Sequence, residues 1–164
     1  METVLITGAG GYIGSNAAEY FHRAGYRVIG VVHCTVADRF KKLGVRTISA
    51  DLTDESSIPS LFDENPDYVV HIAARASDVG RDEWFRVANY EVVKNLASVS
   101  MDRNVKRFVY LSTADVYGLR DFNGENEDEL SFDESAVNPY PKYKILSEKW
   151  LAANLPRERF SCVR

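Results

Sequence analysis

The chain opens on Thr3-Val-Leu-Ile-Thr-Gly-Ala-Gly-Gly-Tyr-Ile-Gly14, where a run of β-forming residues ends abruptly at glycines. Glycines at positions 8, 11 and 14 form a G-x-x-G-x-x-G pattern, and Gly10 allows a G-x-G pattern as well. At a strand-to-helix turn, one glycine permits the tight turn, one lets backbone N–H groups approach a pyrophosphate, and one lets the helix pack close to the sheet. Because the N-terminus of the following helix attracts anions, the stretch predicts dinucleotide binding rather than a mere tight turn.

Length and composition describe one ordinary soluble globular domain. The chain has 164 residues, of which 45% are hydrophobic and 27% charged. A net charge of −4 gives no electrostatic footprint for nucleic acid or an anionic membrane. No apolar run approaches the roughly 18 residues of a membrane span. The first strand starts almost at Met1, which leaves no room for a signal peptide, and Cys34 and Cys162 are too few for a disulfide framework. We therefore expect a cytoplasmic protein.

Apolar runs and helical patterns alternate from the glycines to the end of the chain. Gly25 is placed to end a helix, and Asp54 and Asn138-Pro139 are placed to begin one. The expected strands span 4–7, 27–32, 45–49, 68–72, 107–112 and 160–163. The expected helices span 15–24, 38–43, 55–62, 83–102 and 139–154. This order predicts an α/β fold, a doubly wound parallel sheet of the Rossmann type that takes up residues 1–164.

An acidic segment interrupts the alternation. Between Tyr117 and Val137 there are seven acidic residues, with only Arg120 to balance them. The simpler interpretation is a solvated acidic loop. The alternative is a mobile flap over the active site, because loops that follow strand C-termini border the ligand crevice in such sheets. Carboxylates at irregular spacing define no coordination geometry, so the segment predicts no metal site.

Candidate reacting groups lie near the end of the fifth expected strand and on the last helix. Ser112 and Thr113 place two hydroxyls where the chain leaves the sheet. Tyr140 and Lys144 have i,i+4 spacing, so they share one face of a helix. A cation beside a phenol lowers its pKa from about 10 and makes tyrosine a usable general acid and base. A second pair at 90 and 94 has the same spacing but follows no hydroxyl-bearing strand end, and we interpret it as an ordinary helix-face pair.

These motifs together resemble a known family. The glycine stretch, Asp51-Leu52, His71-Ile-Ala-Ala74, Asn89, the stretch from Ser112 to Gly118 and Tyr140-x-x-x-Lys144 occur in the order found in extended short-chain dehydrogenase/reductases. The subgroup that the chain resembles is the NAD-dependent epimerase/dehydratase family, which acts on nucleotide sugars. The resemblance covers essentially the whole sequence and implies an enzyme that transfers hydride to and from a nicotinamide cofactor.

The resemblance also implies roles for individual residues. Thr113, Tyr140 and Lys144 would be catalytic, with Tyr140 as acid and base. Lys144 would also bind the nicotinamide ribose. The other implied cofactor-binding residues are Gly8, Gly11, Tyr12, Ile13 and Gly14 at the pyrophosphate, Asp51 and Leu52 at the adenine, Ala73 and Ala74 along the ribose and nicotinamide, and Asn89, whose role is the least defined.

Several of these side chains have simpler interpretations. Asp51 is also suited to capping a turn, and Asn89 to anchoring buried backbone. His71 is expected at the edge of the core, while His22 and His33 lack ligand partners at metal spacing. We therefore predict no metal site.

Two positions depart from the family pattern. An NAD-selective site usually has an acid at the end of the second strand, to bind the ribose 2′-hydroxyl. This chain has His33 there, and Arg39, Lys41 and Lys42 just beyond it offer positive charge to a 2′-phosphate. Both NAD and NADP therefore stay open, with a preference for NAD from the resemblance. Ala114-Asp115 stands where the family's dehydratases carry Asp-Glu, which disfavours dehydration and favours epimerisation or reduction.

The sequence leaves the reaction partly open. Family members usually continue past the sixth strand with the segments that bind substrate, and this sequence contains none of them. The leading hypothesis is the cofactor-binding portion of a nucleotide-sugar epimerase. Its rivals are a reductase or hydroxysteroid-dehydrogenase-like enzyme that consumes its cofactor, and a cofactor-sensing module without catalysis. By the resemblance, helices 83–102 and 139–154 are candidates for a homodimer interface.

Overall fold

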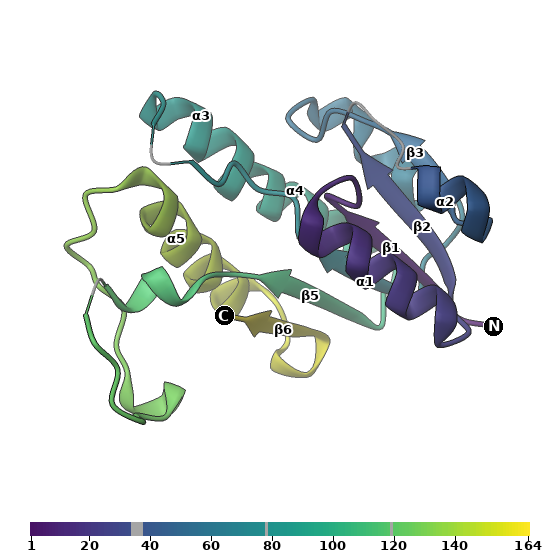
Figure 1. Cartoon of the computed structure of the whole chain (residues 1–164). Helices are drawn as coiled ribbons and strands as arrows, with labels where there is room; N and C mark the ends of the chain where they lie inside the picture. Colours follow the sequence, from purple (N-terminus) through teal and green to yellow (C-terminus); the bar gives the residue numbers. More distant parts are fainter. Residues whose placement is uncertain (34–37, 78, 119) are drawn as a thin grey trace.

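The computed structural model describes residues 1–33, 38–77, 79–118 and 120–164. Of residues 38 and 39 it describes only the backbone. Six parallel strands form one sheet in the order β3-β2-β1-β4-β5-β6. This is the strand order of the Rossmann dinucleotide-binding fold, in which the connection crosses over between β3 and β4 and leaves a crevice at the ends of β1 and β4. The predicted doubly wound parallel sheet is confirmed (Figure 1).

Every strand lies within one residue of its predicted range: β1 begins one residue early, β3 begins one residue late, and β4 and β5 end one residue early. Their bounds are β1 Thr3–Thr7, β2 Arg27–Val32, β3 Arg46–Ser49, β4 Tyr68–His71, β5 Arg107–Leu111 and β6 Phe160–Val163. All five residues of β1 are buried, because this central strand is covered on both faces and has neighbours on both edges. A continuous apolar run is the expected sequence for such a strand.

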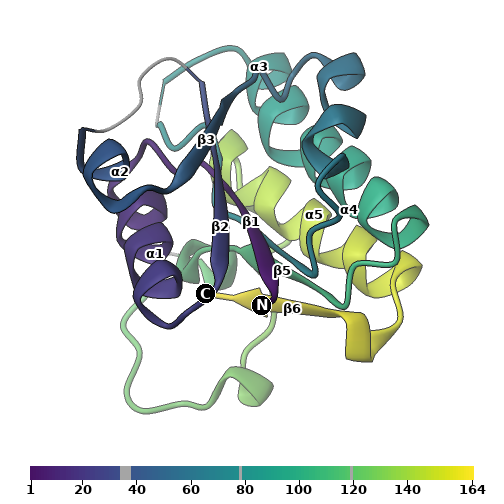
Figure 2. The same cartoon turned by 90° about the vertical axis from the view of Figure 1, so that its right-hand side faces the viewer.

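Helices cover both faces of the sheet (Figure 2). The α-helices are α1 Tyr12–Arg23, α2 Asp38–Leu43, α3 Asp82–Arg86, α4 Val92–Asp102 and α5 Pro139–Asn154. Ala18 of α1 and Phe40 of α2 pack in one core cluster, and Leu96 of α4 and Leu151 of α5 pack in the other. Asn138 caps α5 as predicted, since its side chain accepts a hydrogen bond from Tyr140 N at 2.9 Å.

Two predicted helices take a different form. The range 55–62 contains two 3-10 turns, Glu55–Ser57 and Pro59–Phe62, instead of one α-helix. Proline has no N–H to donate, so Pro59 begins a new turn instead of continuing the first. The range 83–102 is interrupted by a π-helical turn, Val87–Glu91, in which the Asn89 carbonyl accepts a hydrogen bond from the Ser147 hydroxyl at 2.6 Å. Helix α1 begins at Tyr12, three residues before the predicted start.

The acidic segment is a loop, and apolar side chains within it pack against the rest of the protein. Val116, Tyr117 and Ile145 form a small cluster, against which Leu130 and Phe132 of the loop pack. Its 3-10 turn, Glu127–Glu129, has a capping box between Asn126 and Glu129. In Figure 1 the loop extends below α5, away from the centre of the sheet. Within the described residues, no helix is both long and apolar enough to cross a membrane.

Candidate active site

The glycine turn depends on close backbone contacts. Gly8 adopts φ +67°, and a Cβ atom on it would lie 2.8 Å from Ala73 N, just after β4. A Cβ atom on Gly14 would lie 2.1 Å from the Gly8 carbonyl oxygen, which is closer than real Cβ contacts. By contrast, a Cβ on Gly11 would have its nearest neighbour at 3.4 Å. Gly8 and Gly14 thus hold the turn together, and Gly11 leaves space above it.

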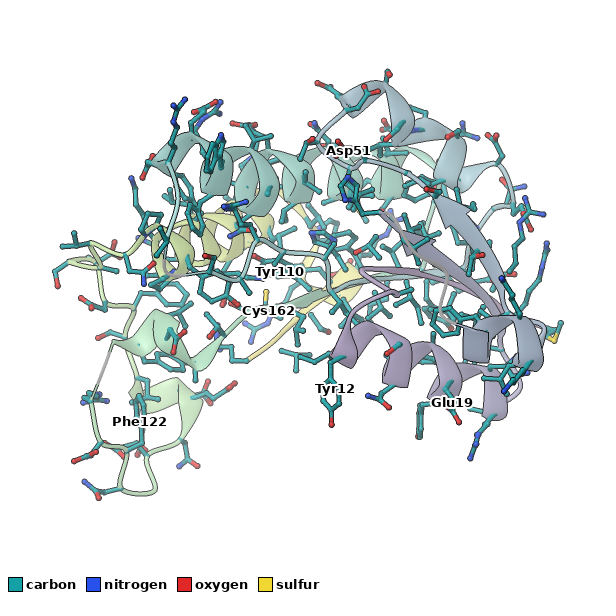
Figure 3. The ribbon with its side chains drawn as sticks, turned by 45° about the horizontal axis from the view of Figure 1, so that its top comes forward. Tyr12, Glu19, Asp51, Tyr110, Phe122 and Cys162 are labelled. Atoms are coloured by element: carbon teal, nitrogen blue, oxygen red, sulfur yellow. The ribbon has the colours of Figure 1, made fainter. Side chains whose placement is uncertain are left out.

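The first turn of α1 is free to receive an anion. Gly11 is the N-cap residue and supplies no side-chain cap, and no acidic residue occupies the first turn. The leading N–H groups of a helix have no partners within the helix and carry its positive partial charge. Tyr12 and Ile13 are 86% and 54% exposed, and Figure 3 shows the Tyr12 ring pointing away from the protein.

Two adjoining cavities meet at this turn. The β3-side cavity, of about 330 Å³, is lined by predicted residues that follow β3 and β4, namely Asp51, Leu52, Ala73 and Ala74. The α5-side cavity, of about 590 Å³, is lined by all five predicted residues of the glycine stretch together with Tyr140 and Lys144. Gly8, His33, Ala73 and Ala74 border both cavities, so the two form one crevice.

The floor of the crevice is held by a buried Thr7–His71 contact. The Thr7 hydroxyl accepts hydrogen bonds from Ile72 N and Ala73 N at 3.1 and 3.2 Å. Its own proton therefore points to His71 Nδ1, 2.7 Å away, which leaves the ring proton on Nε2. Burial, with Lys144 adding to it, lowers the pKa of His71 to about 3, so the ring is neutral. His71 is 1% exposed and is a core residue, as its sequence position indicated.

Lys144 is buried beside the end of β5. Its side chain is 2% exposed, and Nζ donates a hydrogen bond to the Leu111 carbonyl at 2.6 Å. Nζ also lies 4.6 Å from the ring centre of Tyr110 and 5.7 Å from that of Tyr140. Burial lowers the pKa of Lys144 to about 8, while the charge of Glu148 acts in the opposite direction.

The surroundings of Tyr140 do not lower its pKa as the Tyr-x-x-x-Lys spacing led us to expect. Burial raises that pKa, the Asp115 charge raises it further, and a side-chain hydrogen bond with Thr113 lowers it. The reason is geometric, because Nζ of Lys144 bonds to the Leu111 carbonyl and faces the Tyr110 ring. Tyr140 is accordingly a protonated phenol at neutral pH in this arrangement of side chains.

The buried lysine should make stability rise with pH. The folded amine, with a pKa of about 8 instead of 10.5, binds fewer protons than the unfolded amine between these values. Stability therefore increases with pH across that window, by about 3 kcal/mol for this group. The measurement is the free energy of unfolding of the wild type minus that of Lys144→Met, by denaturant titration from pH 7 to 10.5. We expect the difference to grow with pH, and a constant difference would contradict the buried, deprotonating amine.

Thr113 and Asn89 do not border the crevice cavities, although Thr113 is next to one of them. Thr113 caps the 3-10 turn Ala114–Tyr117, its hydroxyl oxygen lying 3.3 Å from Asp115 N, and the neighbouring Ser112 lines the α5-side cavity. Asn89 is 1% exposed. Its side chain bonds to both backbone groups of Arg75, with 2.7 Å from Oδ1 to N and 3.1 Å from Nδ2 to O. This geometry supports the interpretation of Asn89 as a buried anchor.

Asp51 caps a turn and borders the crevice at the same time. Its Oδ1 atom accepts hydrogen bonds from Thr53 N at 2.9 Å and Thr53 Oγ1 at 2.7 Å, and these bonds lower the pKa of Asp51. His33, at the position where an acid is usual, lies with Nε2 3.8 Å from Asp51 Oδ2. The side chains of Cys34, Asp38 and Arg39 lie outside the described residues. In the part of the chain that is described, no cluster of His, Cys, Asp and Glu has metal-binding geometry.

Sequence reasoning missed a buried network behind the reacting groups. Glu148 is 4% exposed and accepts a hydrogen bond from the Ser112 hydroxyl at 2.5 Å. It also pairs with Arg164, whose guanidinium lies 5.3 Å from the Tyr117 ring and reaches Glu127 at 3.4 Å. The network therefore connects the end of β5 to the acidic loop. The i,i+4 spacing of Lys144 and Glu148 was the available signal.

The fold and crevice define a Rossmann-type dinucleotide-binding protein, with a tyrosine and a buried lysine in the same cavity as the glycine turn. A family model, the NAD dependent epimerase/dehydratase family, matches residues 4–160. The chain belongs to this family, as the resemblance implied. NAD, one of the two cofactors that the sequence left open, is the cofactor of the family.

Curated relatives carry nucleotide-sugar names. A putative UDP-arabinose 4-epimerase of Arabidopsis thaliana is 35% identical over 161 residues, which are 88% of this chain and 36% of that protein. The UDP-glucose 4-epimerase of Drosophila melanogaster is 32% identical over 91% of this chain and 47% of its own length. The chain thus spans less than half the length of these two relatives.

Solved structures match the whole chain. The UDP-glucose-4-epimerase of Stenotrophomonas maltophila, with bound NAD and formylated UDP-arabinopyranose, gives a TM-score of 0.86 at 27% identity. The match covers 100% of this chain and 52% of that one. WbmH of Bordetella bronchiseptica, in complex with NAD⁺, gives 0.83 at 26% identity, over 100% of this chain and 56% of that one.

Proposed function

We propose that this chain binds NAD and supplies the acid–base group of a nucleotide-sugar epimerase. The observation that carries the proposal is that Tyr140 and Lys144 line the same cavity as the glycine turn. A cofactor whose pyrophosphate lies on that turn would therefore have one end beside the phenol. The names of the relatives, UDP-glucose and UDP-arabinose 4-epimerases, support a nucleotide sugar as the substrate class.

The crevice fits a dinucleotide in its shape and in its donors. The uncapped start of α1, which follows Gly11, offers backbone N–H groups to the pyrophosphate, as a helix N-terminus does in this fold. The small side chains of Ala73 and Ala74 border both cavities and let a flat ring system approach. The nicotinamide half would then occupy the α5-side cavity, and the adenosine half the β3-side cavity.

The protein's part in the reaction is proton transfer and orientation. NAD, when bound, accepts a hydride from a sugar carbon and later returns it. Tyr140, acting as its phenolate, would take the proton of the hydroxyl on that same carbon, which would become a ketone. Tyr140 gives the proton back when the hydride returns to the other face of the turned sugar. Thr113, bonded to Tyr140, would hold the substrate oxygen in line, and the Lys144 cation would stabilise the phenolate.

The residues after Thr113 favour epimerisation over dehydration. Loss of water needs an acid beside the leaving hydroxyl, and position 114 carries alanine instead. Asp115 is present, and its charge adds to burial in raising the pKa of Tyr140. We further propose that two copies of the chain form a homodimer through α4 and α5. The partly exposed apolar side chain of Leu146 on α5, which is 37% exposed, is available for such a contact.

Titration with NAD tests the cofactor assignment. We expect saturable binding of NAD, followed by calorimetry, and weaker binding of NADP, because the ionised Asp51 carboxylate at the β3-side cavity would repel a 2′-phosphate. Tighter binding of NADP than of NAD would reverse the preference. Absence of saturable binding of either nucleotide would remove the proposed function.

A further inference from the structure

Arg75 occupies a position that no cofactor motif predicts. It follows Ala73 and Ala74 directly after β4, and it lines the β3-side cavity together with Asp51 and Leu52. It also borders a neighbouring hollow beside Trp84 of α3. A long cationic side chain thus stands where the resemblance implied only small and acidic residues.

The surroundings hold Arg75 in one place. The Asn89 amide bonds to both its backbone N and its backbone O. The guanidinium carbon lies 4.9 Å from the ring centre of Trp84 and 5.3 Å from that of Phe85, within the range of cation–π attraction. A Cβ on Gly80 would come within 3.1 Å of the guanidinium, so glycine makes room for it. The position of the side chain is therefore set before any ligand arrives.

The described residues leave the hydrogen-bonding capacity of the Arg75 side chain unused. A guanidinium carries a permanent charge and five N–H donors. Among the described residues no carboxylate forms an ion pair with Arg75, and its buried Nε atom has no acceptor. Glu83, which borders the same hollow, is paired with Arg86 instead. Nε itself is shielded from solvent, so a ligand in the cavity would reach the terminal N–H groups, where acceptors would form charge-assisted hydrogen bonds.

We propose that Arg75 is a binding contact for the adenosine half of the dinucleotide, donating to purine nitrogen or ribose oxygen atoms. This inference rests on the proposed function. If the pyrophosphate lies on the glycine turn and the nicotinamide lies beside Tyr140, the adenosine half is left to the β3-side cavity. The rings of Trp84 and Phe85 contact the guanidinium through cation–π attraction, which does not use its N–H groups, so these groups can donate hydrogen bonds to the ligand. Asn89 then acts as a positioning residue for Arg75.

The test compares Arg75→Met with Arg75→Lys, using calorimetric titration with NAD and with ADP-ribose, which lacks the nicotinamide ring. Methionine keeps the apolar stem and removes the donors, so NAD and ADP-ribose should both bind about 10- to 100-fold more weakly, by the same factor. Lysine keeps the charge without the planar fork, and it should recover only part of the loss. Thermal unfolding of each variant shows that the fold is retained.

Arg81→Met is the matched control. Its guanidinium also lies over the Trp84 ring, at 5.5 Å, but Arg81 is exposed and borders neither crevice cavity. We expect wild-type affinities for this variant. Wild-type affinity of folded Arg75→Met for ADP-ribose would overturn the inference, as would a loss confined to NAD. If the wild type itself bound neither ligand, the proposed function would fail first, and this inference with it.

Discussion

Gly14→Ala is expected to destabilise the protein by about 3 kcal/mol or more and to abolish NAD binding. Within a helix, glycine to alanine is ordinarily stabilising by roughly 0.5–1 kcal/mol. Here the new Cβ would stand 2.1 Å from the Gly8 carbonyl oxygen and 2.6 Å from its carbon, and both are backbone atoms of a constrained turn. The steric cost therefore exceeds the gain in helix propensity, and α1 must move away from the turn that would hold the pyrophosphate.

Gly11→Ala is the matched comparison for this prediction. Its Cβ would have only an ordinary contact at 3.4 Å, and its φ is −82°, so the folded state should lose at most about 1 kcal/mol through the poorer N-cap. Denaturant unfolding of both variants provides the measurement. Equal stability of Gly14→Ala and the wild type would show that α1 does not pack on the turn as described.

On the proposed function, Tyr140→Phe is expected to reduce turnover of a UDP-sugar by about 10²- to 10⁴-fold, which is the usual contribution of a positioned acid and base. The ring remains and only the hydroxyl is lost, so the affinity for NAD should stay close to that of the wild type. Epimerisation of UDP-glucose and UDP-arabinose, measured in the wild type and in the variant, provides the test. Turnover equal to that of the wild type would remove Tyr140 from its proposed role.

Tyr90→Phe is the control for that prediction, because the chain contains a second Tyr-x-x-x-Lys pair. Lys94 lies 5.0 Å from the ring centre of Tyr90 and pairs with Glu91 at 3.0 Å. This pair lies away from the crevice cavities, so the substitution should leave turnover unchanged. The contrast separates the effect of the crevice from the effect of the spacing alone.

Much of the fold could be predicted from the sequence because the strands are buried runs with clear ends. The run Arg27–Val32 has a charged first residue and five buried apolar or glycine positions, and its predicted bounds are those of β2. The interruptions of helices were not predictable from local pattern. The π-helical turn at Val87–Glu91 is tied to bonds from Asn89 to Arg75 and from Ser147, which are 14 and 58 residues away.

Some residues of the candidate site could likewise be predicted from the sequence, and others could be found only in the structure. Spacing identified the glycine turn and the Tyr140–Lys144 pair, because each depends on residues close together in the chain. The free donors of Arg75 and the Ser112–Glu148–Arg164 network were missed, since they arise only when distant elements pack. The raised pKa of Tyr140 could also be seen only in the structure. Burial raises this pKa, and the Lys144 ammonium bonds to the Leu111 carbonyl instead of stabilising the phenolate.

The contact between Gly8 and Ala73 has a consequence for the kinetics of folding. Strand β1 is made first in the chain, yet one of its two neighbours is β4, with Thr7 opposite His71, 64 residues later. Closing so long a loop costs entropy before any contact compensates it, which slows folding. The phosphate-binding turn therefore gains its native shape only when the middle of the sheet closes. Until then the apolar edge of β1 stays open to pairing with other chains.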